Sequence, residues 1–194
     1  MKKLIVPKKY QLFEQETGIN RIISLFFRYP TKEFSLSDVA GIAKVSKSTA
    51  SRILNYLKEI EFIQIVDLGI IWRIKANLES FEFISYKIVF NISLIYYHKI
   101  INSLLGIFKT PKCVVLFGSF RKGEDIEGSD IDIAIEMDNI KELQIINLPE
   151  LKDLEGQLNR RINLYLFNRK TIDLNLFNNI ANGIVLWGFL EVKP

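Results

Sequence analysis

The sequence predicts two domains, a mainly α-helical one followed by a small α/β (α+β) one, joined by a long helix. Apolar residues at helical spacing dominate the front of the chain, whereas short β-rich runs alternate with helical segments after Thr110-Pro111. The charge changes as well. Residues 1–77 carry 13 Lys and Arg against 7 Asp and Glu, and residues 78–194 carry 13 against 15. We place the domains at 1–78 and 110–194, with a connecting helix at 79–109.

The composition excludes several classes of protein. Of the 194 residues, 48% are hydrophobic and 25% charged, with only 10 glycines and 5 prolines, which is not the composition of a disordered or collagen-like chain. One cysteine and one histidine cannot form an intramolecular disulfide or a zinc site of Cys and His ligands. The apolar run before Pro7 is too short for a signal peptide, and polar residues interrupt the most apolar stretch, 83–108. We expect a cytoplasmic protein that does not enter a membrane.

The front domain is expected to contain three helices and a hairpin. Apolar residues at i, i+3 and i+4 predict a helix over residues 14–29, which Pro30 ends. Ser35, with Asp38 three residues later, is expected to cap a second helix, and Ser46 a third. Two β-rich runs at 62–68 and 70–75 then predict a hairpin.

The segment SLSDVAGIAKVSKSTASRILNYLKEIEFI, followed by this hairpin, resembles the winged helix-turn-helix family. The resemblance implies that the domain binds duplex DNA through its third helix. Small polar and basic side chains on the leading turns of such a helix reach phosphates and base edges in the major groove. The alternative is an ordinary three-helix unit whose third helix has a solvated face. The expected DNA-binding residues are Lys47, Ser48, Thr49, Ser51 and Arg52.

The connector, residues 80–108, is expected to be one helix, because its large apolar residues recur at spacings of three, four and seven. This seam, which Lys87 interrupts, packs either on the protein's own domains or on a second copy in a homodimer. His98 has no ligand-type neighbour at a useful spacing, so we interpret it as structural.

Two aspartates at the start of a predicted strand suggest a cation site. Residues 112–117 form a buried β-rich run, Gly118-Ser119 follows at once, and a second strand over 131–136 begins beside Asp130 and Asp132. Residues two apart on a strand point the same way, so these carboxylates lie close together and repel each other unless a cation lies between them. Oxygen ligands of this kind suit Mg²⁺.

The segment from Gly118-Ser119 to Ser129-Asp130-Ile131-Asp132 resembles the nucleotidyltransferases of the DNA polymerase beta superfamily, in particular their minimal, stand-alone type. The resemblance implies that the aspartates bind Mg²⁺ or Mn²⁺ and that the Gly-Ser bend holds the phosphates of a nucleoside triphosphate. The residues expected at the nucleotide are Gly118, Ser119, Lys122 and Ser129, although Ser129 is also suited to capping the turn.

The sequence departs from this family at one position. Members usually carry a third carboxylate on the next core strand, where residues 161–167 place Asn163. An amide cannot take a proton and is a poorer metal ligand. Glu136 shares the strand face of Asp132 but lies too far along the strand to replace it. We expect the acidic residues of the loop, Glu124, Asp125 and Glu127, to be solvated. Helices are expected over 148–159 and 172–186.

Two functions follow. The first is a Mg²⁺-dependent nucleotidyltransferase that moves a nucleoside monophosphate from a triphosphate to a hydroxyl, with Asp130, Asp132 and Asn163 at the reacting centre and a winged helix that binds DNA. The alternative is a DNA-binding transcriptional regulator whose nucleotidyltransferase-like domain binds nucleotide but is catalytically weak or inactive.

Overall fold

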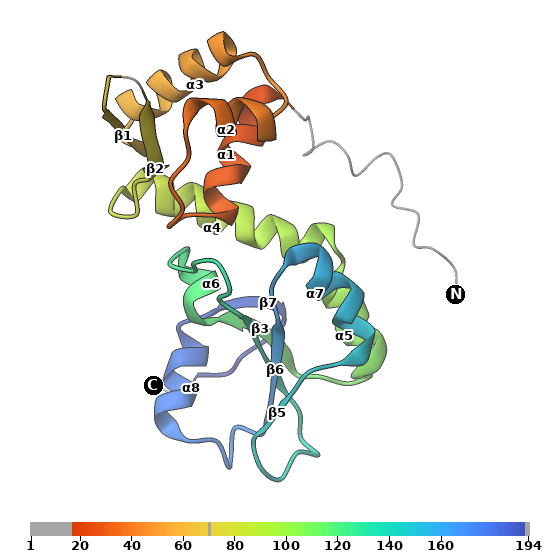
Figure 1. Ribbon diagram of the computed structural model, residues 1–194. Coiled ribbons are helices and arrows are strands. Elements are labelled where there is room, and N and C mark those ends of the chain that lie inside the picture. Colours follow the sequence, from red (N-terminus) through yellow and green to blue (C-terminus); the bar gives the residue numbers. More distant parts are fainter. Residues whose placement is uncertain (1–16, 70, 193–194) are drawn as a thin grey trace. The chain divides into compact units, whose positions relative to one another are not determined.

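The computed structural model describes residues 17–69 and 71–192. The chain divides into two compact units, Met1–Phe83 and Ile84–Pro194, and the border between them falls inside one helix. Figure 1 shows the helical unit in red to yellow and the sheet-containing unit in green to blue. The two units are described separately below.

In its described residues, 17–69 and 71–83, the first unit contains three helices and a two-stranded hairpin, as predicted, before the helix that leads into the second unit. The helices are α1 (Gly18–Arg28), α2 (Leu36–Ile42) and α3 (Lys47–Glu59), and the antiparallel strands are β1 (Ile63–Asp67) and β2 (Trp72–Ala76). Both predicted caps are confirmed: Ser35 forms a capping box with Asp38, and the side chain of Ser46 accepts a hydrogen bond from the Thr49 N–H. Helix α1 begins at Gly18, and the predicted start at Glu14 lies outside the described residues.

The core of this unit is aromatic at one end. The rings of Phe27, Phe62 and Phe83 lie with their centroids 5.0 to 5.6 Å apart, in tilted and edge-to-face pairs. Phe83 is fully buried although it belongs to the helix that leads into the second unit. An isolated bridge between Phe34 and Ile74 attaches the segment before α2 to the hairpin.

The connector is not one helix, which corrects the prediction. It consists of α4 (Phe81–Tyr97) and α5 (Ile100–Ile107), which meet at an angle of 48°. Lys99 adopts a left-handed backbone conformation, with φ 53°, and thereby ends the helical hydrogen bonding of α4. The bend allows Ile100, Ile101 and Leu104 to enter the core of the second unit, so burial of these side chains compensates for the broken helix.

A five-stranded mixed sheet forms the second unit, in the order β5-β6-β4-β3-β7. Strands β4 and β6 run parallel, and the other neighbouring pairs are antiparallel. The strands are β3 (Cys113–Phe117), β4 (Ile131–Glu136), β5 (Gln144–Ile146), β6 (Ile162–Phe167) and β7 (Ile184–Gly188). The helices are α6 (Gly118–Lys122), α7 (Lys152–Leu158), which a 3₁₀ turn at Pro149–Leu151 precedes, and α8 (Leu174–Ala181).

The two faces of this sheet bury different side chains. Val114 and Leu116 of β3 join a large core with residues from α4, α5 and α6, whereas Cys113, Val115 and Phe117 join a smaller core with α8. This alternation is the period of two that a strand imposes. On β4, Ile133 belongs to the large core and Ala134 to the smaller one. Because Asp132 is two residues from Ala134, it lies on the face of the smaller core.

The end of the chain differs from the prediction. A helix was expected over 172–186, but α8 ends at Ala181 and the residues after Gly183 form β7, which pairs with β3. A Cβ at Gly183 would lie 2.6 Å from the Leu116 carbonyl oxygen, so the tight turn into β7 needs glycine here. The run Ile184-Val185-Leu186-Trp187 suits a strand as well as a helix, and pairing with β3 decides between them.

Within residues 17–69 and 71–192, no single helix is long and apolar enough to cross a membrane, although α4 and α5 together meet the length and composition criteria as a bent pair.

Candidate functional site

Strand pairing brings the three polar residues of the predicted site together. In the antiparallel pair β3–β4, Asp132 lies opposite Phe117, the last residue before Gly118. In the parallel pair β4–β6, Asp132 lies opposite Asn163. Asp130 stands just before β4 and, being two residues away, shares the orientation of Asp132. The site therefore lies at the end of β3 and at the starts of β4 and β6.

Gly118 is needed both for its conformation and for its size. Its φ is 76°, in the left-handed region that favours glycine. A Cβ added there would lie 2.6 Å from Asp132 Oδ2, well inside van der Waals contact. Helix α6 begins at Gly118, which makes Ser119 its second residue. The Gly-Ser bend and the Asp132 carboxylate are thus immediate neighbours, as the sequence motif requires.

Asn163 donates hydrogen bonds to both aspartates. Its Nδ2 lies 3.0 Å from Asp130 Oδ2 and 3.3 Å from Asp132 Oδ1. Its Oδ1 accepts a hydrogen bond of 3.1 Å from Nδ2 of Asn147, which also donates to the Ile162 carbonyl at 2.9 Å. Since ionised carboxylates and carbonyls only accept, these partners determine the orientation of both amides. An N–H donor therefore occupies the position where the family usually has a third carboxylate.

Tyr165 belongs to the site and was missed by sequence reasoning. Its ring packs edge-to-face on Phe117 with centroids 4.9 Å apart, and its hydroxyl is near enough to Asp132 for each group to affect the pKa of the other. Burial, and then the charge of Asp132, raise the pKa of this tyrosine. Its sequence signal was its position two residues after Asn163, on the same face of a predicted strand.

The electrostatics of Asp132 combine opposing effects. Burial raises its pKa, and the nearby charge of Asp130 acts in the same direction. Hydrogen bonds from Asn163 and Tyr165 act the other way, because they stabilise the ionised form. A carboxylate whose ionised form is disfavoured by burial gains more from a bound cation than a fully solvated one does.

The donor set fits one hard cation. Two carboxylates that share one amide donor offer the oxygen ligands that Mg²⁺ prefers, and Mg²⁺ commonly binds through one or two carboxylates together with phosphates and water. Among the described parts of the chain, no group of three or more His, Cys, Asp or Glu residues is arranged to hold a metal. The residues present thus fit a single Mg²⁺ or Mn²⁺ at Asp130 and Asp132.

The other residues expected at the nucleotide surround this pair less closely. Ser119 is half-buried at the start of α6. The side chain of Lys122 is 54% exposed and lies 3.8 Å from Glu124. Ser129 accepts a hydrogen bond of 3.0 Å from the Ile126 N–H, so its hydroxyl caps the turn before Asp130.

One residue of the intervening loop corrects the expectation. Asp125 is buried, with 1% exposure, whereas the sequence suggested that it is solvated. Three polar side chains from elsewhere in the second unit contact it.

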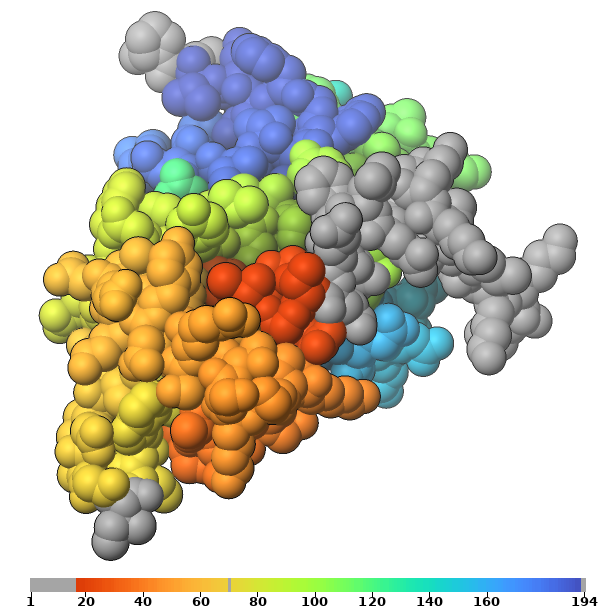
Figure 2. Space-filling view, turned by 90° about the horizontal axis from the view of Figure 1, so that it is seen from above, coloured from red at the N-terminus to blue at the C-terminus, as the bar shows by residue number. Residues whose placement is uncertain are grey.

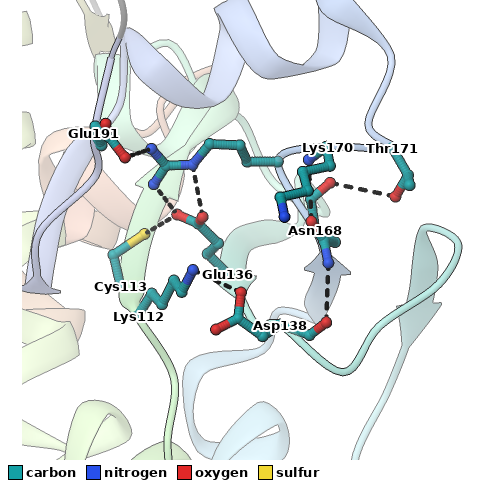
Figure 3. A network of polar contacts seen from close by, with 9 residues as sticks. Lys112, Cys113, Glu136, Asp138, Asn168, Lys170, Thr171 and Glu191 are labelled. Atoms are coloured by element: carbon teal, nitrogen blue, oxygen red, sulfur yellow. Dashed lines mark hydrogen bonds and ion pairs between the residues drawn. The ribbon is translucent and has the colours of Figure 1, made fainter.

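Glu136 lies at the opposite end of β4 from the aspartates and serves a different network. Figure 3 shows its carboxylate beside Cys113, near Lys112 and Glu191. Arg169 donates to both of its oxygens, at 2.8 and 2.9 Å, and also pairs with Glu191. Burial raises the pKa of the Cys113 thiol to about 12, which disfavours the nucleophilic thiolate. Glu136 therefore does not supply the third carboxylate.

The residues expected to bind DNA lie along α3 of the first unit. Lys47, Ser48 and Arg52 are exposed, and Ser51 is half-buried. Thr49 is engaged in the cap of the helix, where its hydroxyl accepts a hydrogen bond of 2.8 Å from Ser46. Figure 2 shows the orange surface of α2 and α3 beside the yellow hairpin. A shallow depression of about 600 Å³ is lined by Ser48, Ser51, Arg52, Asn55, Tyr56 and Glu59.

Comparison with known proteins bears on the second unit. None of the curated proteins compared with the chain matches it. Among solved structures, the heme sensor protein PefR from Streptococcus agalactiae, crystallised in complex with heme, is 17% identical over 51% of this chain and 81% of its own, with a TM-score of 0.30. A likeness this weak carries no argument. The family model "Polymerase beta, Nucleotidyltransferase" matches residues 99–188. This part of the chain, which holds Gly118, Asp130 and Asp132, is thus similar to a nucleotidyltransferase domain of the polymerase beta family.

Proposed function

We propose that the protein is a Mg²⁺-dependent nucleotidyltransferase that moves a nucleoside monophosphate from a nucleoside triphosphate to a hydroxyl acceptor. The observation that carries the proposal is the pair Asp130 and Asp132 placed against the Gly118 bend, within a segment that matches the family. Nucleotidyl transfer develops charge on phosphate oxygens, so positioned donors and cations supply most of the acceleration.

Each residue has a role in this proposal. Gly118 lets the main chain approach the phosphates, and Ser119 and Lys122 donate to them. Asp130 and Asp132 hold the divalent ion, which, when bound, neutralises phosphate charge. Ser129 shapes the turn that presents Asp130. Tyr165 and Asn163 orient the aspartates through hydrogen bonds.

The test is pyrophosphate release from each of the four common ribonucleoside triphosphates with Mg²⁺, comparing the wild type with Asp130→Asn and Asp132→Asn. Both variants should lose release and Mg²⁺-dependent nucleotide binding. The matched control is Asp153→Asn, an exposed aspartate on α7. Release that is absent from the wild type, or equal in wild type and variants, would exclude the enzyme.

The amide of Asn163 favours a second candidate function. In this alternative the domain binds a Mg²⁺-nucleotide complex but turns it over slowly or not at all, because no third carboxylate takes the proton of the acceptor hydroxyl. The chain is then a regulator that senses nucleotide. Calorimetry should show micromolar uptake of a triphosphate with Mg²⁺, without pyrophosphate release. Absence of uptake with either Mg²⁺ or Mn²⁺ would exclude both functions.

In both candidate functions the first unit binds duplex DNA as a winged helix-turn-helix domain. The exposed basic and polar side chains of α3 next to the β1–β2 hairpin support this proposal. Mobility shifts on duplex DNA should weaken with salt and with Lys47→Ala or Arg52→Ala, whereas Lys152→Ala on α7 should have no effect. Binding that ignores salt and both substitutions would contradict it.

Dimerisation through the connector is a further proposal. The predicted seam is buried within the chain at Phe83, Ile101 and Leu104, so a second copy would have to contact another face. On α4, Tyr86, Val89 and Tyr96 are 61%, 65% and 54% exposed and recur at helical spacing. Apolar side chains on one face of a helix suit contact with the same face of a second copy. A sedimentation experiment at micromolar concentration should show a dimer, and a monomer would remove the proposal.

A further inference from the structure

A buried group of charged and polar side chains contacts the loop that leads to Asp130. Asp125, in this loop, is 1% exposed. Lys87 and Asn91 reach it from α4 and are 0% and 2% exposed. Arg160, which lies between α7 and β6, completes the group, with 9% exposure of its side chain. We call these four residues the buried cluster.

Asp125 is the centre of the buried cluster. Its Oδ1 lies 3.2 Å from Lys87 Nζ and 2.7 Å from Asn91 Nδ2, and its Oδ2 lies 2.6 Å from Arg160 Nη2. Lys87 also donates to the main-chain oxygen of Asp125. Burial lowers the pKa of Lys87, and the charge of Asp125 opposes that effect. One carboxylate therefore binds two cations and an amide, all withdrawn from water.

The buried cluster holds main chain on both sides of the candidate site. Arg160 Nη1 donates to the carbonyls of Ile126 and Ser129, at 2.8 and 2.9 Å, and Ser129 directly precedes Asp130. The guanidinium also lies over the ring of Phe120, 5.4 Å from its centroid. Asn91 donates to the Phe120 carbonyl at 2.8 Å, within the short helix that starts at Gly118. The Gly118 bend and Asp130 are thus attached to the same four side chains.

Such an arrangement is a costly way to stabilise a fold. Withdrawing ions from water costs several kcal/mol each, and apolar residues of similar size often stabilise a core better than a buried ion pair. The planar guanidinium of Arg160 instead offers donors at a fixed spacing, which Lys or an apolar residue cannot reproduce. Its hydrogen bonds to the carbonyls of Ile126 and Ser129 therefore indicate that it fixes the conformation of the loop.

We propose that the buried cluster, through Arg160, fixes the conformation of the loop at residues 123–130. The loop in turn holds Asp130 in the position relative to Gly118 that binding of a Mg²⁺-nucleotide complex requires. The inference rests on the proposed function for its ligand. Its effect on the loop is separate and can be measured without nucleotide.

The test compares the full-length wild type with Arg160→Lys, which keeps the charge but cannot bind Asp125 and both carbonyls at once. Hydrogen exchange of the amides of residues 124–131, measured without ligand, should become at least tenfold faster. Calorimetric affinity for a triphosphate with Mg²⁺ should fall at least tenfold. The midpoint of thermal unfolding is recorded in parallel, since a merely structural role would change that midpoint alone.

Two further variants make the result decisive. Lys87→Met removes one cation at similar length and should accelerate exchange in the same loop. It takes the place of Arg160→Lys should that variant not fold. Asp153→Asn is the control, because Asp153 is an exposed acid on α7 outside the loop, and it should change neither readout. Unchanged loop exchange in a folded cluster variant overturns the inference. A wild type that binds no nucleotide, with loop exchange that responds as expected, instead overturns the proposed function alone.

Discussion

Replacing Asn163 by aspartate tests the interpretation of the site most directly. The substitution removes an N–H donor that lies 3.0 and 3.3 Å from two carboxylates and introduces a third acidic group. Hydrogen bonds to charged groups contribute about 1.5–3 kcal/mol each. Without metal, the three carboxyls relieve their repulsion by taking up a proton. The shared proton re-forms one of the two hydrogen bonds, so the net loss is at least about 1.5–3 kcal/mol, the contribution of one hydrogen bond to a charged group.

This loss should be visible in the thermal unfolding of the second unit. A domain of this size shifts by about 4 °C per kcal/mol, so Asn163→Asp should unfold at least about 6–12 °C lower in EDTA at pH 7. Added Mg²⁺ binds three carboxylates better than two and should reverse most of the shift, because a ligand stabilises the state that binds it. Circular dichroism melts with EDTA and with MgCl₂ measure both effects.

The control is Asn179→Asp, an exposed position on α8. If Asn163→Asp melted like the wild type in EDTA, or gained no more from Mg²⁺ than the wild type does, our assignment of a cation site at Asp130 and Asp132 would be refuted. Pyrophosphate release by the same variant shows in addition whether the missing carboxylate limits turnover.

Three further predictions concern single residues. Gly118→Ala should abolish the binding of a triphosphate with Mg²⁺, measured by calorimetry, and cost about 1–2 kcal/mol of stability. The reason is that φ is 76° and the new methyl would lie 2.6 Å from Asp132. Undiminished binding would contradict the assignment of a nucleotide site at Gly118. Burial raises the pKa of Asp132, so without metal the folded state binds its proton more tightly than the unfolded state. The free energy of folding gained from this proton is fully present below the ordinary pKa of 3.8 and is lost as the pH rises through the raised pKa. In EDTA, the melting midpoint of Asp132→Asn should therefore vary less between pH 4 and 7 than that of the wild type. Cys113, buried and with its pKa raised to about 12, should react with iodoacetamide only at the rate of unfolding, whereas rapid labelling of the native protein would show that this region opens locally.

The local signals in the sequence were sufficient for much of the fold. Ser35 and Ser46 cap helices through hydrogen bonds that span only three residues, so short stretches of sequence determine both helix starts. The Asp-x-Asp spacing likewise predicted that Asp130 and Asp132 point the same way, because a strand orients alternate residues alike, and Asn163 donates to both. Where neighbouring residues determine the geometry, the sequence was a sufficient guide.

Features that depend on distant partners were not predictable. The helix break at Lys99 has no Gly or Pro to mark it, and the core contacts of α5 account for it instead. Residues 184–188 suit two structures, and only the neighbouring β3 selects a strand. Asp125 looks like a loop carboxylate until Lys87 and Arg160 are brought to it from 38 residues before and 35 residues after.

Helix α4 leaves no clean place to separate the two halves of this protein. Phe83 fills the aromatic core of the first unit, and one helical turn later Lys87 neutralises Asp125 in the second. A C-terminal fragment that started at residue 99, where the family match begins, would retain Asp125 and Arg160 without Lys87 and Asn91. A fragment that started at residue 84 would retain all four residues, while the remaining piece, which ends at Phe83, would keep only the first three residues of α4. Expression trials of the isolated halves should therefore favour the longer C-terminal fragment, and exchange of either half for another domain should require α4 to be replaced with it.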